Sequence, residues 1–179
     1  AVDKVRYVGE PVAVVIAENR YLAEDALSGV TVDYETLPVA VDTEFAIESG
    51  AAILHEKVGG NVVSDRTFRY GDPETAFAEA DRQVSIKVRF PRSSCMPIEC
   101  YVVLAQFDPA NSAFDITSNF QGPYALHSVM CRALQVPANR LRLRTPPESG
   151  GSFGIKQGVF PYVVMMGLVA RKVGAPVKW

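Results

Sequence analysis

Residues 148–157 read ESGGSFGIKQ, a turn-like stretch with three glycines and one aromatic residue. A strand-like run precedes it at residues 140–145, and a long apolar run follows it at residues 159–173. Glycine has no Cβ atom, so it lets the backbone approach a ligand closely and adopt positive φ angles. A glycine-rich turn that opens a helix also gathers unpaired N–H groups, which suit an anion or an oxo group. The stretch therefore predicts a tight strand-to-helix turn, either purely structural or shaped for a ligand.

This turn matches neither of the two common nucleotide-binding patterns. A Walker loop requires glycine where Ile155 stands, then lysine and serine or threonine, and the dinucleotide fingerprint requires G-x-G-x-x-G. A second candidate ligand segment, SNFQGPY at residues 118–124, lies between a predicted strand end and a predicted helix start. Such places favour ligand contacts in layered α/β folds. The amide of Gln121 either donates to an oxo or carbonyl group there or caps the helix and bonds the loop.

Composition and charge exclude several classes of protein. Of the 179 residues, 48% are hydrophobic and 21% are charged, as is typical of a globular protein. The net charge of −2 and the scattered lysines and arginines predict no nucleic-acid partner. The lack of an apolar run of about 18 residues predicts no membrane span. Three cysteines without C-x-x-C spacing favour a reducing, cytoplasmic compartment and argue against a zinc site.

Alternating and continuous apolar runs predict an α+β protein with two domains. A glycine-containing stretch with little periodicity at residues 49–61 separates them, so we predict domains at residues 1–58 and 59–179. The elements expected in the first domain are strands at residues 5–7, 12–17 and 30–34, a helix capped by Asn19, and a short helical turn at residues 43–47.

The second domain is predicted to hold most of the strands and three helices. The expected strands are residues 62–69, 84–90, 101–107, 114–117, 140–144 and 176–179. The expected helices are one that begins at Asp72–Pro73, one with an apolar stripe from Leu126 to Leu134, and one at residues 159–173 that stops at Gly174. Because the chain starts and stops in strand-like runs, we expect it to be a piece of something longer.

No complete catalytic constellation follows from residue spacing, so no catalytic residue and no metal ligand is predicted. Glu99, among apolar neighbours, is either a carboxyl group with a tuned pKa or a carboxylate held by a salt bridge or backbone N–H groups. Cys95 and Cys100 are expected to be small buried hydrophobic residues. The alternative is a nucleophile paired with His127, which would make a Cys–His hydrolase. His55 is expected to be an exposed connector residue.

Two groups of short motifs follow one another along the chain. The first group is VRYVGEPVA at residues 5–13, AEDA at 23–26 and VDYETLP at 32–38. The second group is GD at 71–72, AFAEAD at 76–81, PIE at 97–99, QGP at 121–123, GGSFGIK at 150–156 and PVKW at 176–179. The first group resembles the a/b hammerhead domain of the xanthine oxidase and aldehyde oxidase family, which includes the large subunits of bacterial carbon monoxide dehydrogenases. The second resembles the family's molybdopterin-binding domain. The resemblance covers essentially the whole chain and implies a partial hammerhead domain followed by the first α/β subdomain of a molybdopterin-binding domain.

The resemblance also implies site residues. In the family, the glutamine that matches Gln121 lies beside the metal and donates to its oxo ligand. The loop residues that line the molybdenum match Gly151, Ser152, Phe153 and Gly154. Ser152 and Ile155 replace family glycines, and a side chain at Ile155 resists positive φ, so we expect the far side of the loop to differ. Gln157 is expected near the substrate; it replaces the substrate-binding glutamate of xanthine-oxidising members, which disfavours a purine.

The function that the resemblance implies is the oxidation of an aldehyde, an N-heterocycle or carbon monoxide, with oxygen from water, at a molybdenum–molybdopterin cofactor. Bacterial relatives commonly use a dinucleotide form, such as the cytosine dinucleotide, and electrons pass to iron–sulfur and flavin subunits or domains. The family's general-base glutamate and its later cofactor-binding segments match no residue here. We therefore expect this chain alone to bind no molybdopterin and to be inactive. The alternative is a non-catalytic interaction module that retains the hammerhead surface.

Overall fold

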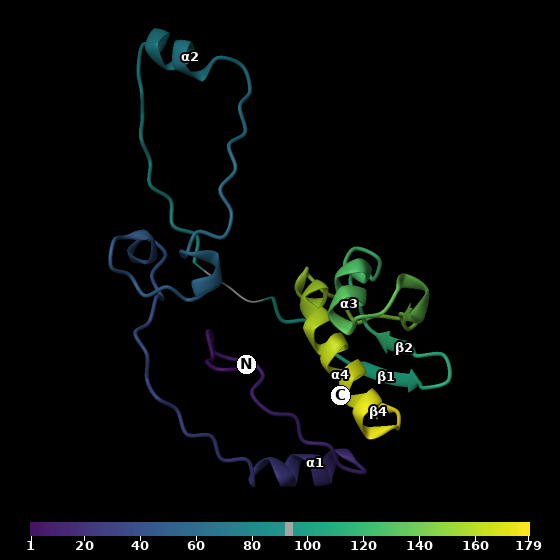
Figure 1. Cartoon of the computed structure of the whole chain (residues 1–179). Coiled ribbons are helices and arrows are strands. Elements are labelled where there is room, and N and C mark those ends of the chain that lie inside the picture. The colour runs from purple at the N-terminus through teal and green to yellow at the C-terminus, as the bar shows by residue number, and fades with distance from the viewer. Residues whose placement is uncertain (92–94) are drawn as a thin grey trace. The chain divides into compact units, whose positions relative to one another are not determined.

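The computed structural model describes residues 1–91 and 95–179 (Figure 1). It divides into two compact units, Ala1–Val84 and Ser85–Trp179. The domain boundary that the glycine-containing stretch predicts at residues 58–59 stays a prediction. Within the described ranges, no helix is both long enough and apolar enough to cross a membrane.

The first unit contains short helices, and capping side chains explain where its two α-helices start. They are α1 (Arg20–Leu27), the 3₁₀ helices η1 (Phe45–Ile47) and η2 (Glu56–Val58), and α2 (Pro73–Glu79). The side chain of Asn19 accepts a hydrogen bond from the N–H of Leu22 at 3.0 Å. That of Asp72 accepts from the N–H of Thr75 at 3.3 Å. Each bond satisfies a donor that the first helical turn leaves unpaired, and the predicted starts of both α-helices are confirmed.

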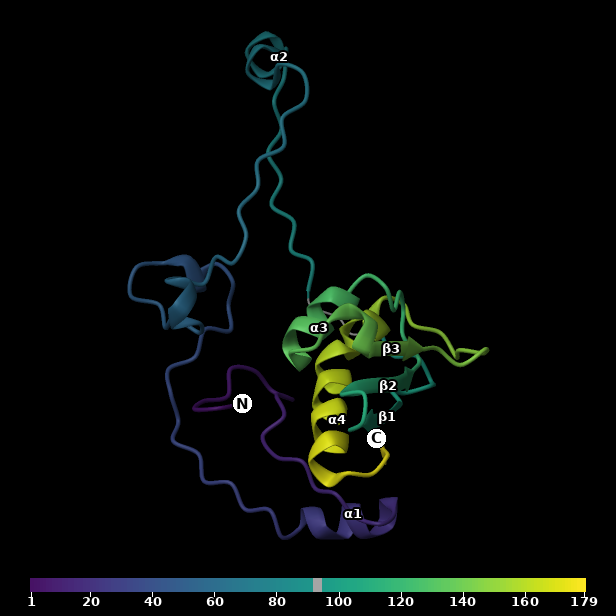
Figure 2. The ribbon, with the colours of Figure 1, turned by 45° about the vertical axis from the view of Figure 1, so that its right-hand side comes forward.

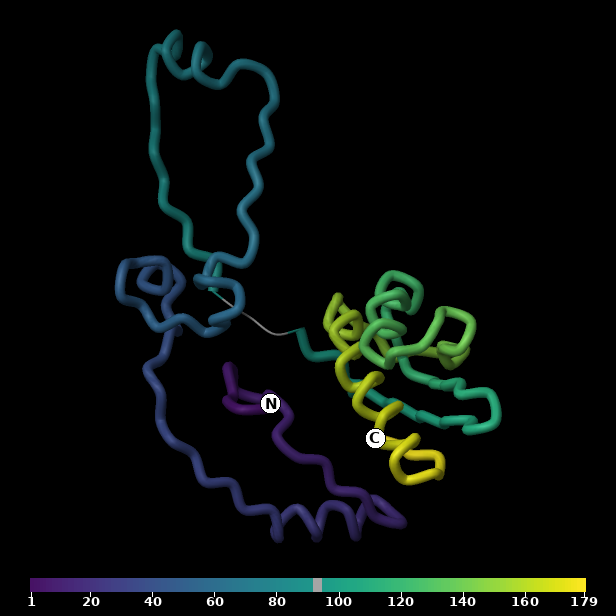
Figure 3. The backbone as a smooth tube through the Cα atoms, in the orientation of Figure 1, coloured from purple at the N-terminus to yellow at the C-terminus, as the bar shows by residue number. Residues whose placement is uncertain are grey.

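The strands predicted before β1 are wrong. The predicted strands without a ladder are residues 5–7, 12–17, 30–34, 62–69 and 84–90. Figures 2 and 3 show such stretches as open chain between the short helices. Their apolar side chains are exposed, as Val14 at 39% and Ile86 at 83% illustrate. A strand forms only when its N–H and C=O groups bond to a neighbour, whereas apolar alternation reports side-chain preference and not the presence of that neighbour.

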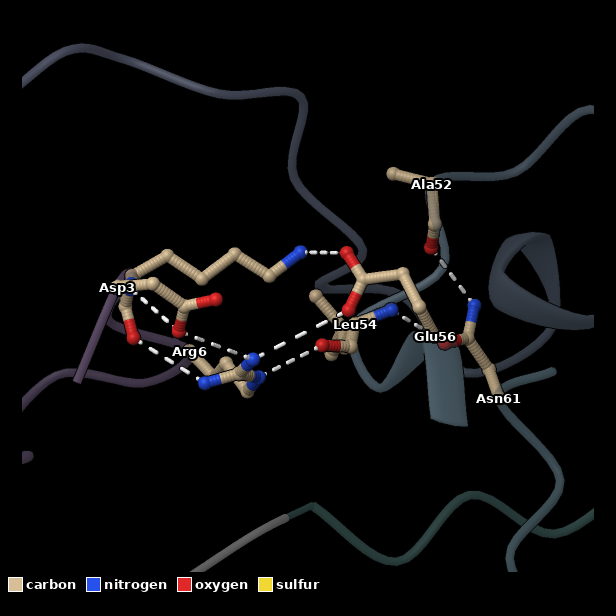
Figure 4. A network of polar contacts seen from close by, with 7 residues as sticks. Asp3, Arg6, Ala52, Leu54, Glu56 and Asn61 are labelled. Carbon is tan, nitrogen blue, oxygen red and sulfur yellow. Dashed lines mark hydrogen bonds and ion pairs between the residues drawn. The ribbon is translucent and has the colours of Figure 1, made fainter. Parts of the chain in front are cut away.

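A polar network joins the start of the chain to the η2 region inside the first unit (Figure 4). Lys4 forms an ion pair with Glu56, and Arg6 Nε donates to the carbonyl oxygen of Leu54 at 2.9 Å. The hydrogen bond from Lys4 holds the pKa of Glu56 below its usual value. Asn61 Oδ1 accepts from the N–H of Leu54 at 3.0 Å. Side-chain bonds, rather than a sheet, therefore connect these two segments.

A four-stranded sheet organises the second unit. Its strands are β1 (Val103–Asp108), β2 (Ala113–Ser118), β3 (Leu141–Arg144) and β4 (Val177–Lys178), in the order β3-β2-β1-β4. β1 pairs antiparallel with β2 and with β4, and β2 pairs parallel with β3. The parallel pair needs a crossover connection, which contains α3 (His127–Leu134) and the 3₁₀ helix η3 (Ala138–Arg140). The four strands that the sequence predicts in this region are confirmed, with β4 shorter than expected.

Helices α3 and α4 (Phe160–Val173) cover one face of this sheet (Figure 2). The core between the layers includes Val103, Ala105, Phe114, Ile116, Met130, Leu134, Val163 and Met166. Gly167 lets α4 approach closely, because a Cβ atom there would lie 3.3 Å from side-chain atoms of both Ile116 and Leu134. Both helices match the apolar stripes of the sequence, and α4 stops before its cap residue Gly174, whose φ is 71°.

An aromatic cluster closes the β4 end of the sheet. Trp179 and Val103 exchange two backbone hydrogen bonds, each 2.9 Å long. The Trp179 ring stacks on Tyr162 of α4, with 4.6 Å between ring centroids and 14° between ring planes. The end of the sheet is thus held both to β1 and to α4. Together, the mixed sheet, its helical layer and the short helices of the first unit make this an α+β chain, as predicted.

Candidate functional site

The glycine-rich turn lies between β3 and α4 and leads into the 3₁₀ helix η4 (Ile155–Val159). Its backbone takes positive φ angles at Gly151 (87°), Phe153 (52°) and Gly154 (92°). Glycine adopts such angles freely, but for Phe153 the conformation is strained. The Phe153 side chain is exposed, at 74%. The tight strand-to-helix turn that the sequence predicts is therefore present.

Gln121, which follows β2, contacts this turn directly. Its Oε1 accepts a hydrogen bond from the N–H of Gly154 at 2.9 Å and another from the hydroxyl of Ser152. The N–H of Gln121 donates to the carbonyl oxygen of Lys156 at 3.4 Å. Because a backbone N–H can only donate, the oxygen of the carboxamide must face the turn. The amide nitrogen Nε2 therefore points elsewhere, and it has no acceptor among the described residues.

The carboxylate of Glu99 binds two residues of the turn, Lys156 and Gly150. Its Oε1 pairs with the ammonium group of Lys156, whose side chain is fully buried. The same oxygen accepts from Asn119 Nδ2 at 2.6 Å, and Oε2 accepts from the N–H of Gly150 at 2.9 Å. The hydrogen bond from Lys156, followed by those from Asn119 and Gly150, lowers the pKa of Glu99 to about 2. The sequence left two interpretations of Glu99 open, and the structure agrees with the carboxylate held by a salt bridge and a backbone N–H group.

Gly150 is glycine because Glu99 lies against it. A Cβ atom at residue 150 would stand 2.6 Å from the Cβ atom of Glu99, closer than real side chains approach. This close approach allows the N–H of Gly150 to reach the carboxylate. The small residue at the start of the turn is therefore explained by packing within the protein rather than by a ligand.

Asn119 and Tyr101 tie the same region to the sheet. The oxygen of the nearly buried Asn119 side chain accepts from the N–H of Val102 at 3.1 Å, and its nitrogen donates to the carbonyl oxygen of Cys100 at 2.8 Å. The hydroxyl of Tyr101 donates to the carbonyl oxygen of Ile155 at 2.7 Å. The turn, the start of β1 and the end of β2 thus form one bonded assembly.

Several backbone donors of the turn remain available. The N–H groups of Gly151, Ser152 and Phe153 make no hydrogen bond within residues 1–91 and 95–179. Gln157, in contrast, donates its N–H to the carbonyl oxygen of Gly154 at 3.2 Å, and the residue is exposed. Ile155 has no positive φ, so its side chain is accommodated in η4. The available donors therefore gather in the central part of the turn.

In the described part of the chain, His127 makes its contacts with Leu141 and Cys131 rather than with Cys95 or Cys100. Cys95 and Cys100 are exposed, so their expected burial is wrong; they precede β1 and lie outside the layer between sheet and helices. His127 Nε2 lies 2.9 Å from the carbonyl oxygen of Leu141, and its Nδ1 lies 3.7 Å from the sulfur of Cys131, one turn further along α3. Burial raises the pKa of the Cys131 thiol, which disfavours a thiolate.

The sequence reasoning singled out the segments that contain Lys156 and Asn119 but missed their pairing with Glu99. Lys156 and Asn119 carry no periodic signal of their own, because their common partner Glu99 lies 57 and 20 residues away in the chain. The position of Lys156 at the start of an apolar helix was the available signal, since a lysine there is either exposed or paired. In the described part of the chain, no group of three or more His, Cys, Asp or Glu residues is placed to hold a metal ion.

Two family profiles match the chain. The family profile for the molybdopterin cofactor-binding domain matches residues 54–179. A second profile, for the a/b hammerhead domain of aldehyde oxidase and xanthine dehydrogenase, matches residues 1–38. The chain belongs to the xanthine oxidase and aldehyde oxidase family. The resemblance seen in the short sequence motifs is thereby confirmed, and the glycine-rich turn with Gln121 lies in the cofactor-binding domain of this family.

Individual relatives agree with the family profiles. The chain is 39% identical to the gamma subunit of the 6-hydroxypseudooxynicotine dehydrogenase complex of Paenarthrobacter nicotinovorans, over all of this chain and 22% of that protein. It is 31% identical to the carbon monoxide dehydrogenase large chain of Hydrogenophaga pseudoflava, over 99% of this chain and 24% of that protein. Its structure resembles that of quinoline 2-oxidoreductase from Pseudomonas putida 86, with a TM-score of 0.76, 30% identity, and coverage of 91% and 20% of the two chains. The chain thus spans less than a quarter of the length of these relatives.

Proposed function

We propose that this chain contributes one wall of the molybdenum-cofactor site of an oxidoreductase. Its contribution is made by Gln121 together with Gly151, Ser152, Phe153 and Gly154. The contact that carries the proposal is the hydrogen bond from the N–H of Gly154 to Gln121 Oε1 at 2.9 Å. This bond brings together two motifs 33 residues apart and turns the Gln121 amide nitrogen away from the loop as an available donor.

The donors in the turn fit a cofactor rich in oxygen acceptors. Gln121 Nε2 and the N–H groups of Gly151, Ser152 and Phe153 lack acceptors among the described residues, so they are able to bind the oxygen atoms of such a group. Lys156 does not fit the role of an anion ligand, because its buried ammonium group already pairs with Glu99. Binding in this part of the site is therefore expected from neutral donors rather than from a cationic side chain.

The chain's own residues bind and orient rather than react. When bound, the molybdenum cofactor supplies the two-electron oxidation of a substrate, with oxygen taken from water. Gln121 and the turn would hold the cofactor through its oxygen atoms, since the carboxamide is oriented by Gly154 and Ser152. Gln157, just beyond the turn, is proposed to lie near the substrate, where its neutral amide replaces a carboxylate. A purine that needs a carboxylate partner is therefore disfavoured.

For the substrate we propose an aldehyde, an N-heterocycle or carbon monoxide. The N-heterocycle and carbon monoxide parts of this range are supported by the names of relatives, which include nicotine 6-hydroxylase, quinoline 2-oxidoreductase and carbon monoxide dehydrogenase. The proposed electron acceptors are iron–sulfur and flavin subunits or domains, in agreement with a relative that is the gamma subunit of a dehydrogenase complex. We also propose that the cofactor has the cytosine dinucleotide form and that the protein is located in the cytoplasm.

An exchange of segments tests the cofactor role of Gln121. Residues 1–179 replace the matching part of the 6-hydroxypseudooxynicotine dehydrogenase gamma subunit, and molybdenum content and activity of the complex are measured. We expect the hybrid to retain molybdenum, and we expect Gln121→Ala to weaken molybdenum retention about 10- to 100-fold. Gln106→Ala, at an exposed position of β1, is the matched control and should leave retention unchanged. A folded hybrid without molybdenum would contradict the proposal and favour the interaction module.

A further inference from the structure

We infer that Glu99 is a positioning residue for the glycine-rich turn: its carboxylate gathers Lys156, Asn119 and Gly150 and thereby keeps the turn on Gln121. That the turn serves a cofactor rests on the proposed function above. The positioning itself does not, because it concerns contacts within this chain.

Three donors from separate segments converge on this one carboxylate. The ammonium group of Lys156 comes from the end of the turn, the N–H of Gly150 from its start, and Nδ2 of Asn119 from the residue after β2. Both ends of the turn are therefore fastened to the same side chain. The central part, with Ser152 and Gly154, lies between these two attachments and reaches Gln121.

The burial of Lys156 makes this arrangement depend on charge. The Lys156 side chain is 1% exposed, whereas the Glu99 side chain is 36% exposed. A buried ammonium group without its counter-ion costs a large desolvation penalty. Neutralising Glu99 would therefore favour a conformation in which Lys156 reaches water, and the end of the turn would move with it. The carbonyl oxygen of Lys156 also accepts a hydrogen bond from the N–H of Gln121. This movement would therefore break the bond between the end of the turn and Gln121.

An amide cannot replace the carboxylate at this point. A carboxylate offers two acceptor oxygens, whereas the Glu99→Gln side chain offers one oxygen and one NH₂ donor group. Asn119 and Gly150 donate to different oxygens of Glu99, so one of them would face the new NH₂ group. This conflict persists even when Lys156 is also removed.

Amide hydrogen exchange, followed by NMR in the whole 179-residue chain, tests the inference. The reporter is the N–H of Gly154, which bonds to Gln121 and has no hydrogen bond to Glu99, and the reference is the N–H of Ile116 in the core of the sheet. In Glu99→Gln we expect Gly154 to exchange about tenfold faster, beyond any change at Ile116. Glu148→Gln, which removes an exposed carboxylate next to the turn, is the control and should leave both rates unchanged.

A double variant separates positioning from simple charge balance. Glu99→Gln/Lys156→Met has no unpaired buried charge, so we expect its melting temperature to return toward that of the wild type while the N–H of Gly154 still exchanges fast.

Equal acceleration of exchange at Gly154 and Ile116 in the single variant would overturn the inference. So would recovery of both stability and Gly154 protection in the double variant, which also decides the matter if the single variant does not fold. These measurements use no cofactor, so they stand whatever the molybdenum content of the hybrid complex.

Discussion

Single residues in this protein show how one functional group can satisfy several neighbours. Asn119 uses its oxygen for Val102 and its nitrogen for Cys100 and Glu99, and Gln121 uses its oxygen for Ser152 and Gly154. The sequence indicates that such side chains favour the region after a strand, but not which of their atoms point inward. In Gln121, the oxygen faces the turn, and this orientation leaves the amide nitrogen able to donate to a ligand.

Glu99 makes the stability of the second unit depend on pH. The pKa of its carboxyl falls from the ordinary 4.5 to about 2 in the folded protein, so the unfolded chain binds the proton more readily. The stabilisation of the folded state by the contacts of ionised Glu99 is therefore fully present above pH 4.5, and it is lost as the pH falls through 2. We expect the difference in melting temperature between the wild type and Glu99→Gln to be constant above pH 4.5 and to shrink below it. A difference that grows on acidification would contradict the assignment.

At the scale of elements, helices were more predictable than strands. The starts of α1 and α2 follow from a local rule, because Asn19 and Asp72 bond to N–H groups three residues ahead. β1 and β2 were also predictable, since a short turn at Asp108 brings the two strands together as an antiparallel pair. The runs in the first unit have the same apolar patterns without a neighbour, and no local rule reveals that difference.

The packing of α3 on the sheet and on α4 gives a stability prediction at this scale. Leu134 is almost fully buried, and its side chain lies where α4 approaches through Gly167. We expect Leu134→Ala to lower the free energy of unfolding of the second unit by about 2–5 kcal/mol, through lost burial and a cavity. Leu104→Ala, at a half-exposed position of β1, should cost about 1 kcal/mol or less. Urea denaturation of both variants measures the contrast, and equal losses would contradict the packing described here.

At the scale of the whole molecule, the family was predictable from the order of short motifs, whereas the contacts of the candidate site were not. QGP and GGSFGIK indicated two segments of one site, and the structure brings both segments together through Gln121. Glu99 was left between two readings, because its partner Lys156 is remote in sequence. Long-range pairs of this kind leave no periodic pattern, so only the folded chain reveals them.

The whole chain is expected to bind no molybdenum by itself. It offers the donors of a single turn and Gln121, while the remaining polar groups of a pterin would stay without partners. Mass spectrometry of the purified 179-residue chain, expressed with an active cofactor supply, should find molybdenum far below one atom per chain. One molybdenum atom per chain would contradict this prediction and assign a complete site to these residues.

Trp179 is the single tryptophan of the sequence, and it stacks on Tyr162 where the last strand meets α4. Indole fluorescence is sensitive to the surroundings of the ring. Selective excitation of this indole therefore gives an optical signal from the second unit only, free of any contribution from residues 1–84. Unfolding of the second unit can thus be followed in the unlabelled chain without a signal from the first.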